Sequence, residues 1–356
     1  MPSHRSNTIL GWDIGGAHLK VALVDADGTA LEVMQLPCPL WQGLEQLQSA
    51  VSTALDSLTM EPAQHAITMT GELADIFLER SAGVKQIADI MSQRLGTALR
   101  FYAGRDGWVT AAEIGKHTAA VASANWLASA SFAASQIQDG LFVDIGSTTT
   151  DLVAIADGKP CPRGFTDAER MQYEELVYTG VVRTPLMALG PRVPFAGEWQ
   201  TLAAEHFATT ADVYRLTGDL READDMSATA DGAAKTLPAS ARRLARMIGR
   251  DLGDASLPAW IALAQVFKQQ QVDRLKQAVL RCFSYNTIDA TTPIVGAGAG
   301  RFLVRELARQ LGHPYIDAVE LVAAQTEVVR QAAALCLPAY AVARLSAGIT
   351  DIKTAA

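Results

Sequence analysis

One pattern occurs twice in the chain, about 130 residues apart, and it restricts the possible folds more than any other feature. The segment ILGWDIGGAHLKVALVDADGTA, residues 9–30, reads as strand, glycine-containing loop, strand and Asp-Gly turn. The segment LFVDIGSTTTDLVAIADG, residues 141–158, repeats that order, and each copy carries Asp-Ile-Gly at its loop. A repeat at this distance is typical of two similar lobes rather than of a short-period solenoid.

The rest of the chain suits two α/β lobes, because 356 residues with 49% hydrophobic content can bury two cores. Apolar alternation predicts three consecutive antiparallel strands over residues 8–37. Further along, apolar spacing predicts these elements: helix over 41–58, strand over 65–73, helix to about 95, strand over 98–103 and alanine-rich helix over 109–136. We place the first lobe at 1–139 and the second at 140–339, with a helical insertion at about 165–290. A C-terminal helix at about 340–356 is expected to pack back on the first lobe.

The two hairpin loops have a composition that suits phosphate. Glycine lets backbone N–H groups converge on an anion without interference from a Cβ atom, and hydroxyl side chains add donors. Aspartates beside the loop would repel a bare phosphate, but they fit if Mg²⁺ stands between carboxylate and phosphate. Ordinary Asp-Gly or Gly-Ser hairpins are the alternative, which the matched pair of loops disfavours. The predicted phosphate-binding residues of the two loops are Gly15, Gly16, His18, Lys20, Gly146, Ser147, Thr148, Thr149 and Thr150.

A third glycine-rich turn, IVGAGAG at residues 294–300, lies where a strand is expected to run into a helix. It adds Gly296, Gly298 and Gly300 to the predicted phosphate-binding residues. A dinucleotide-binding fingerprint is the alternative, but that motif ordinarily opens its own domain. The late position of this turn, after two phosphate-type hairpins, favours the nucleotide-binding wall of a two-lobed protein.

The composition disfavours a nucleic-acid-binding protein, a disulfide-rich protein and a zinc protein. The net charge of -8 disfavours a nucleic-acid partner. Four widely spaced cysteines favour neither a disulfide framework nor a zinc site. With neither a signal peptide nor an apolar run of membrane-spanning length, we expect a cytoplasmic protein that acts on small molecules without a membrane partner, with a homo-oligomer left open.

The order of DIGG, DIGSTTTD and VGAGAG resembles the superfamily of sugar kinases, heat-shock proteins and actin. DIGSTTTD is similar to its hydantoinase/oxoprolinase branch. Four segments in the middle of the chain resemble one small family of that branch, linked to tetrahydromethanopterin-dependent one-carbon metabolism: SANWLASA, LVYTGVVRTP, FATTADVYRLTGDL and ARRLARMIGRD. The resemblance implies a two-lobed, actin-like ATPase (ribonuclease H-like) fold with duplicated mixed β-sheets flanked by helices.

The resemblance also implies a reaction. Archaeal members of that family join an aminomethylfuran diphosphate to the phenol of γ-glutamyltyramine during methanofuran assembly, with loss of diphosphate. We expect Asp13, Asp144 and Asp151 to be catalytic, with Asp13 and Asp144 holding Mg²⁺. Asn125, Arg183 and Asp212 are expected to bind substrate; for each we also weighed a purely structural role, respectively a helix-end Asn, a salt bridge and an exposed helix acid.

Two other functions stay open at this level. The first is an ATP-dependent kinase or amide-opening ATPase of the oxoprolinase type, in which the loops would bind ATP. His18 counts against a simple kinase, because sugar kinases usually place a small hydroxyl residue there. The second is a non-catalytic, nucleotide-dependent assembly protein of the actin type, for which the sequence identifies no polymerisation surface.

Overall fold

The computed structural model describes residues 8–286 and 289–347, and the chain divides into two compact units. Unit 1 comprises residues 1–138, 157–160 and 318–356, and unit 2 comprises 139–156 and 161–317. The predicted return to the first lobe at about residue 340 therefore begins earlier, at Ala318. The cause is a backbone connection, because Ala30 donates to Ala323 at 2.8 Å and accepts from Gln325 at 3.1 Å. The end of the predicted C-terminal helix, 348–356, lies outside the described residues.

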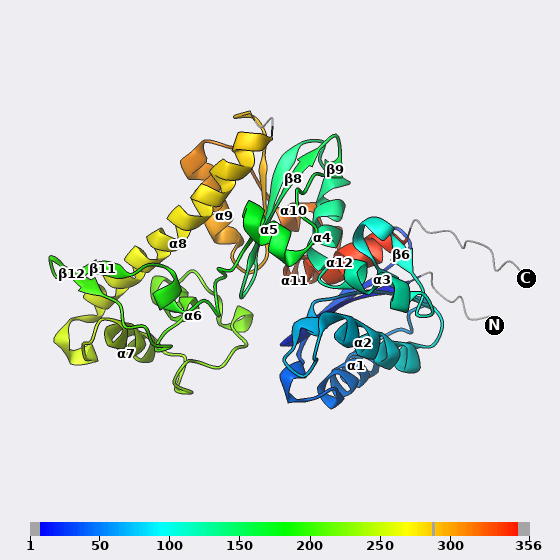
Figure 1. Ribbon diagram of the computed structural model, residues 1–356, viewed down its shortest axis with the longest axis horizontal. Coiled ribbons are helices and arrows are strands. Elements are labelled where there is room, and N and C mark those ends of the chain that lie inside the picture. The colour runs from blue at the N-terminus through cyan, green and yellow to red at the C-terminus, as the bar shows by residue number, and fades with distance from the viewer. Residues whose placement is uncertain (1–7, 287–288, 348–356) are drawn as a thin grey trace, which may run out of the picture. The chain divides into compact units, whose positions relative to one another are not determined.

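Unit 1, which contains the N-terminal segment drawn in blue in Figure 1, is built on a mixed sheet in the order β3-β2-β1-β4-β5-β6. The first three strands are consecutive and antiparallel, as predicted, whereas β4 and β5 continue the sheet in parallel with β1. This is the strand order of a ribonuclease H-like fold. The strands are β1 (Ile9–Ile14), β2 (His18–Val24), β3 (Ala30–Pro37), β4 (Gln64–Met69), β5 (Leu99–Tyr102) and β6 (Trp108–Val109).

Helices cover both faces of this sheet. Trp12 and its neighbours in β1 share an apolar core with buried residues of α1 (Glu45–Ser57) and α2 (Arg80–Leu95). On the opposite face, Gly11 lies against the carbonyl of Ala339 in α12 (Leu337–Ser346), where any Cβ would clash. The alanine-rich helix predicted over 109–136 is two helices, α3 (Ile114–Val121) and α4 (Asn125–Ala134), separated at Ser123, whose φ is +51°. The remaining helices of this unit are α10 (Ala318–Leu321) and α11 (Glu327–Leu335).

Unit 2 repeats the hairpin of unit 1, which confirms the duplication predicted from the sequence. Its sheet has the order β10-β8-β7-β13-β14, with β7 antiparallel to β8 and parallel to β13. The pairs Asp13–Lys20 and Asp144–Asp151 hold equivalent places at the tips of the two hairpins. The strands are β7 (Gly140–Ile145), β8 (Thr150–Ala156), β10 (Leu176–Val177), β13 (Ile294–Ala297) and β14 (Tyr315–Asp317); the short β9 (Lys159–Pro160) belongs to unit 1.

Residues 165–290, where we expect a helical insertion, contain helices and one two-stranded hairpin. A two-stranded hairpin, β11 (Arg192–Phe195) and β12 (Glu198–Thr201), turns through Ala196 and Gly197, both at positive φ. The sequence FAGE lacks the Asn-Gly or Asp-Gly signal typical of such turns, so the hairpin could not be predicted. This region contains α5 (Asp167–Tyr173), α6 (Thr210–Thr217), α7 (Leu237–Met247) and α8 (Leu257–Tyr285), whereas α9 (Arg301–Leu311) follows β13.

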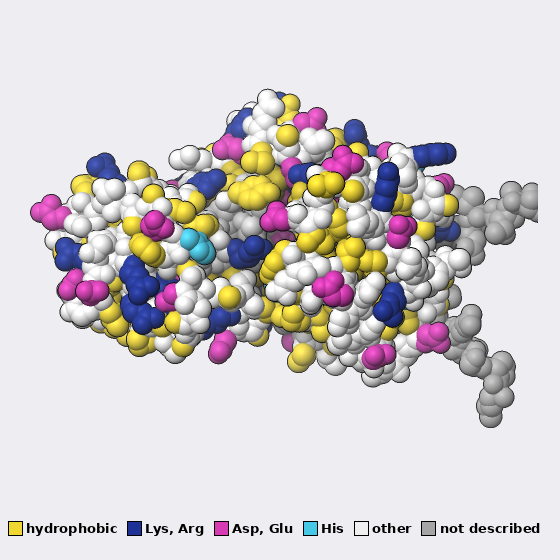
Figure 2. Space-filling model, turned by 60° about the horizontal axis from the view of Figure 1, so that its bottom comes forward, with side chains coloured by type: hydrophobic (Ala, Val, Ile, Leu, Met, Phe, Trp, Pro, Cys, Tyr) yellow, Lys and Arg dark blue, Asp and Glu magenta, His cyan; other side chains and the backbone are white. Residues whose placement is uncertain are grey.

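Charged side chains of both signs are interspersed over the face seen in Figure 2. The arginine run at 242–250 follows this pattern, because Arg242 and Arg246 on α7 both pair with Asp231. Within the described residues, no single helix is long and apolar enough to cross a membrane; one pair, α11 and α12, passes by length and composition together but is bent by 98°.

Candidate phosphate-binding site

The two hairpin tips are closed by the same hydrogen bond. The amide of Gly15 donates to the carbonyl of His18 at 2.9 Å, and the amide of Gly146 donates to the carbonyl of Thr149, also at 2.9 Å. Each bond spans a four-residue tip that begins with the glycine of Asp-Ile-Gly. The sequence repeat is therefore a repeat of backbone geometry, in residues 15–18 and 146–149.

In the first tip the Gly15 amide closes the turn, and the carbonyl oxygens of the residues around it accept hydrogen bonds from neighbouring segments. The carbonyls of Ile14, Gly16 and Ala17 accept hydrogen bonds of 2.9–3.0 Å from the amides of Thr70, Leu40 and Cys38. Among the described residues, no acceptor is found for the amides of Gly16 and Ala17. Backbone donors without acceptors at a glycine-containing turn form a concave anion site.

The second tip has the same polarity and adds hydroxyl groups. The carbonyl of Gly146 accepts from Val181 at 3.0 Å, and that of Ser147 accepts from Val182 at 3.1 Å and Arg183 at 2.8 Å. In the part of the chain that the structure describes, the amides of the next three residues, Ser147, Thr148 and Thr149, have no acceptor. Their hydroxyls lie on the same partly exposed tip. The Ser147 and Thr148 hydroxyls lie 3.4 Å apart and share a hydrogen bond, so the tip offers three amides and at least two hydroxyl protons as donors for an anion.

Glycines allow the neighbouring segments to approach this tip closely. A Cβ at Gly180 would lie 2.5 Å from the carbonyl carbon of Ser147 and 2.5 Å from the amide nitrogen of Thr148. In the turn after β13, a Cβ at Gly298 would lie 2.3 Å from Oδ1 of Asp144, and Gly298 also has a φ of +78°. Side chains at these positions would displace the tip or its aspartate.

The turn that contains Gly296, Gly298 and Gly300 therefore supports the base of the second hairpin, between β13 and α9 as predicted. The amide of Gly300 donates to the carbonyl of Ile145 at 2.8 Å. Gly296 packs against the ring of Tyr315, where a Cβ would lie 2.7 Å from the nearest ring carbon.

Asp13, at the end of β1, lies among polar groups of unit 1. Its carboxylate is 3.8 Å from Nζ of Lys20 and 3.5 Å from Nδ2 of Asn125, the first residue of α4. Burial raises the pKa of the Asp13 carboxyl above its ordinary value, and the charge of Lys20 and the two side-chain hydrogen bonds oppose that shift. Three predicted site residues thus meet at one place in unit 1.

Two buried groups near this place escaped prediction as site residues. Thr68 pairs in register with Asp13 across β4 and β1, and no partner for its fully buried hydroxyl exists among the described residues. Glu72, 1% exposed, accepts a 2.7 Å hydrogen bond from Ser123, two residues before Asn125. The contact between Glu72 and Ser123 spans 51 residues, so no local pattern in the sequence indicates it.

Asp151 and Thr150 anchor the second hairpin from inside. The Asp151 carboxylate accepts from Arg170 at 2.8 Å, and that arginine is 1% exposed. Burial raises the pKa of Asp151, and Arg170 opposes the shift. The Thr150 hydroxyl, fully buried, donates to the carbonyl of Thr179 at 2.7 Å. Both predicted residues hold the tip to neighbouring segments.

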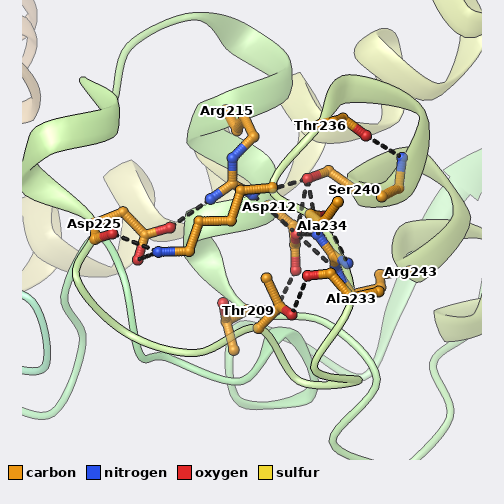
Figure 3. A network of polar contacts seen from close by, with 12 residues as sticks. Thr209, Asp212, Arg215, Asp225, Ala233, Ala234, Thr236, Ser240 and Arg243 are labelled. Atoms are coloured by element: carbon orange, nitrogen blue, oxygen red, sulfur yellow. Dashed lines mark hydrogen bonds and ion pairs between the residues drawn. The ribbon is translucent and has the colours of Figure 1, made fainter.

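The remaining substrate candidates lie in different settings. Arg183 is exposed directly beside the second tip, and no ion pair to its guanidinium is found among the described residues. Asp212 is buried rather than an exposed helix acid: its Oδ1 accepts from Ser240 and from Nε of Arg243, both at 2.8 Å, and from Arg215 at 3.2 Å (Figure 3). A carboxylate with this many partners holds α6 to α7.

For Mg²⁺, the chain offers oxygen donors rather than a preformed cage. Within the described residues there is no group of three or more His, Cys, Asp or Glu side chains arranged to hold a metal ion. Asp13 and Asp144, each beside an anion-binding tip, have the hard oxygen ligands that Mg²⁺ takes when phosphate supplies the others. The chemistry of these donors fits a Mg²⁺–phosphate complex.

Known proteins resemble the chain over most of its length. A sequence model of the hydantoinase/oxoprolinase family matches residues 64–343. The (4-{4-[2-(gamma-L-glutamylamino)ethyl]phenoxymethyl}furan-2-yl)methanamine synthase of Methanocaldococcus jannaschii is 32% identical over 244 residues, which cover 68% of this chain and 72% of that enzyme. The enzyme of the same name from Methanococcus vannielii is 32% identical over 139 residues, 39% of this chain and 62% of that protein.

Solved structures resemble the chain in fold. A nucleotide-free structure of acetone carboxylase matches with a TM-score of 0.52 and 11% identity, covering 86% of this chain and 68% of that one. At this identity the likeness concerns the fold alone. It agrees with the α/β architecture of duplicated mixed sheets described above.

Proposed function

The chain belongs to the hydantoinase/oxoprolinase family, and we propose that it forms an aryl ether in the synthesis of a methanofuran-type cofactor. The substrates are an aminomethylfuran diphosphate and the phenol of γ-glutamyltyramine. The bond between the methylene carbon and the diphosphate oxygen breaks, and a bond from the phenol oxygen to that carbon forms. The phenolic proton is lost, and diphosphate is released. The alternative is an ATP-dependent kinase or amide-opening ATPase.

The observation that carries this proposal is the second tip. Three amides that have no acceptor among the described residues lie beside the hydroxyls of Ser147, Thr148 and Thr149, in a turn whose Gly146 and Ser147 carbonyls accept from the protein. Such an array stabilises a departing diphosphate because its donors already point to where negative charge develops. The furan oxygen shares the positive charge that develops on the methylene carbon, so stabilising the leaving group promotes ionisation.

The other residues have roles that follow from their positions. We propose that Asp13 and Asp144 are the ligands to Mg²⁺, which would neutralise charge on the leaving group when bound. Asn125 orients Asp13, whereas Arg183 supplies a cation beside the second tip. Lys20 limits the repulsion between Asp13 and a phosphate. Holding the phenol oxygen near the methylene carbon contributes an entropic share of the rate.

Product mass spectrometry tests the proposal. The purified protein is given Mg²⁺, the furan diphosphate and γ-glutamyltyramine, with ATP present or absent. We expect the ether and free diphosphate in equal amounts without ATP. Absence of ether in both reactions, together with ATP consumption when an amide or another phenol is supplied, would contradict the transferase and favour the ATP-dependent alternative.

A further inference from the structure

A short segment, residues 179–184, holds the second tip in place; we call it the strap. Its amides at Val181, Val182 and Arg183 donate to the carbonyls of the tip, and Gly180 packs against the backbone of Ser147. The strap binds the carbonyl oxygens of Gly146 and Ser147. In a peptide plane the N–H points opposite to the C=O, so the amides that follow these carbonyls point away from the strap. The position of the strap therefore sets the direction of the anion-binding donors.

The strap is tied in turn to a glutamine in the middle of the long helix α8. Nε2 of Gln271 donates to the hydroxyl oxygen of Thr179 and to the carbonyl of Gly180, both at 2.9 Å. Its Oε1 accepts the hydroxyl proton of Tyr214 on α6. Gln271 and Tyr214 are both fully buried.

These bonds form one continuous path from the helical region to the tip. Tyr214 donates to Gln271, Gln271 donates to Thr179, and the carbonyl of Thr179 accepts from Thr150 at the start of β8. A second branch passes through the carbonyl of Gly180, which also accepts from Thr210 at 2.9 Å. Buried polar groups are costly unless all are satisfied, so such a network fixes one geometry.

Gln271 is a polar residue on an otherwise apolar, buried face of α8. The neighbours of Gln271 on the buried face of α8 include Phe267, Val272 and Leu275, all at most 1% exposed. The carboxamide is the polar group on this face, and it joins two oxygens of the strap to the hydroxyl of Tyr214.

We propose that Gln271 and Tyr214 are positioning residues for the diphosphate-binding tip, an inference that rests on the proposed function. They act through the strap and do not touch the substrate. Helices α6 and α8 thus control how well the amides of residues 147–149 fit the diphosphate. Loss of either side chain should weaken anion binding beyond what loss of stability explains.

The test measures binding of inorganic diphosphate with Mg²⁺ by calorimetry, with the Tm of each protein measured alongside. Tyr214→Phe removes one hydroxyl and keeps the ring, which packs edge-on to Phe302. Gln271→Met removes both donors at similar volume. The matched control is Tyr340→Phe, because Tyr340 is also buried and donates to a carbonyl, that of Gly28 at 3.0 Å, but lies in unit 1.

We expect Tyr214→Phe to weaken diphosphate binding about threefold and Gln271→Met about tenfold, from the usual effect of leaving buried polar groups unpaired. Tyr340→Phe should lower Tm similarly without changing affinity. If Tyr214→Phe and Gln271→Met both bind diphosphate as tightly as Tyr340→Phe does, the inference is overturned. Wild-type protein that binds diphosphate but forms no ether would reject the proposed reaction alone, whereas wild-type protein that binds no diphosphate would overturn both.

Discussion

Gly180 lies so close to Ser147 that a methyl group on its Cα would stand 2.5 Å from the Ser147 carbonyl carbon. Real Cβ atoms are not found at such distances from backbone, so one of the two segments must move when the glycine is replaced. Neither is free to do so, because the strap and the tip are joined by three backbone hydrogen bonds.

Replacing Gly180 should therefore disable the site. We expect Gly180→Ala to lower kcat/KM about a hundredfold, the scale seen when an aligned donor to a developing negative charge is lost. The control is Gly253→Ala in the same unit, since no atom lies within 4 Å of a Cβ at Gly253. Steady-state kinetics of both variants measure this effect. If Gly180→Ala is as active as Gly253→Ala, the tip tolerates displacement.

Arg183 should act on an anionic group of the substrates. We expect Arg183→Ala to raise KM about tenfold, because the exposed guanidinium beside Ser147 is lost. Comparing γ-glutamyltyramine with tyramine identifies the anion. If Arg183 binds the glutamyl carboxylate, the variant loses its preference for γ-glutamyltyramine; if it binds diphosphate, KM for the furan substrate rises. Arg192→Ala, which removes another exposed arginine of unit 2, serves as control, and unchanged kinetics in Arg183→Ala would remove this residue from the site.

The ionised Asp13 carboxylate should lower the stability of the folded protein and support its activity. Burial raises the pKa of Asp13 in the folded protein, so the ionised carboxylate opposes folding. The loss of folding free energy is absent below the pKa of the unfolded chain and grows as the pH rises to the pKa of the folded protein. Asp13→Asn should therefore raise Tm at pH 7 and have little effect on Tm near pH 3, while activity falls about a hundredfold. Thermal melts at both pH values, with activity assays at pH 7, test this. A lower Tm at pH 7 would mean that the pair with Lys20 outweighs burial.

Unit 1 should lose stability in mild acid through His65. Its Nδ1 accepts from the indole of Trp12 at 3.2 Å, and burial lowers the pKa of His65 to about 4. The unfolded chain binds a proton near pH 6.5 and the folded chain does not until about pH 4, so stability falls over that interval. The loss at pH 5 relative to pH 7.5 is about 2 kcal/mol.

Urea unfolding followed by tryptophan fluorescence at these two pH values measures the loss. In His65→Asn the amide oxygen can still accept from Trp12, but no titrating group remains. The difference between the two pH values should shrink by about 2 kcal/mol in that variant. A difference equal to that of wild type would assign the acid sensitivity to other groups.

The elements predicted best from the sequence are those fixed by local pattern. Residues 9–30 and 141–158 form matched hairpins because alternation and Asp-Gly turns act over a few residues. The glycine turn at 294–300 was placed between strand and helix for the same reason. The break at Ser123 was not predicted, since a positive φ at serine has no local signal and is supported by the distant Glu72.

The sequence indicates where the glycine loops lie in the fold, but it does not indicate which residues hold them in place. Gln271 reads in the sequence as one polar residue in KQQQ, and only the fold brings it to Gly180, 91 positions away. The partners of Asp212 likewise come from α6 and α7, so its burial could not be inferred from its helix alone. Contacts of this kind depend on tertiary structure that periodicity does not encode.

In the proposed reaction, the diphosphate leaves from the methylene carbon and the phenol oxygen bonds to that carbon. Furan diphosphate that carries ¹⁸O in the oxygen joining the methylene carbon to phosphorus tests which bond breaks. Mass spectrometry of both products, without ATP, locates the label. We predict that all of it appears in the released diphosphate and that the ether is unlabelled. Label retained in the ether would show that a phosphorus–oxygen bond was cleaved instead, and would rule out the proposed reaction.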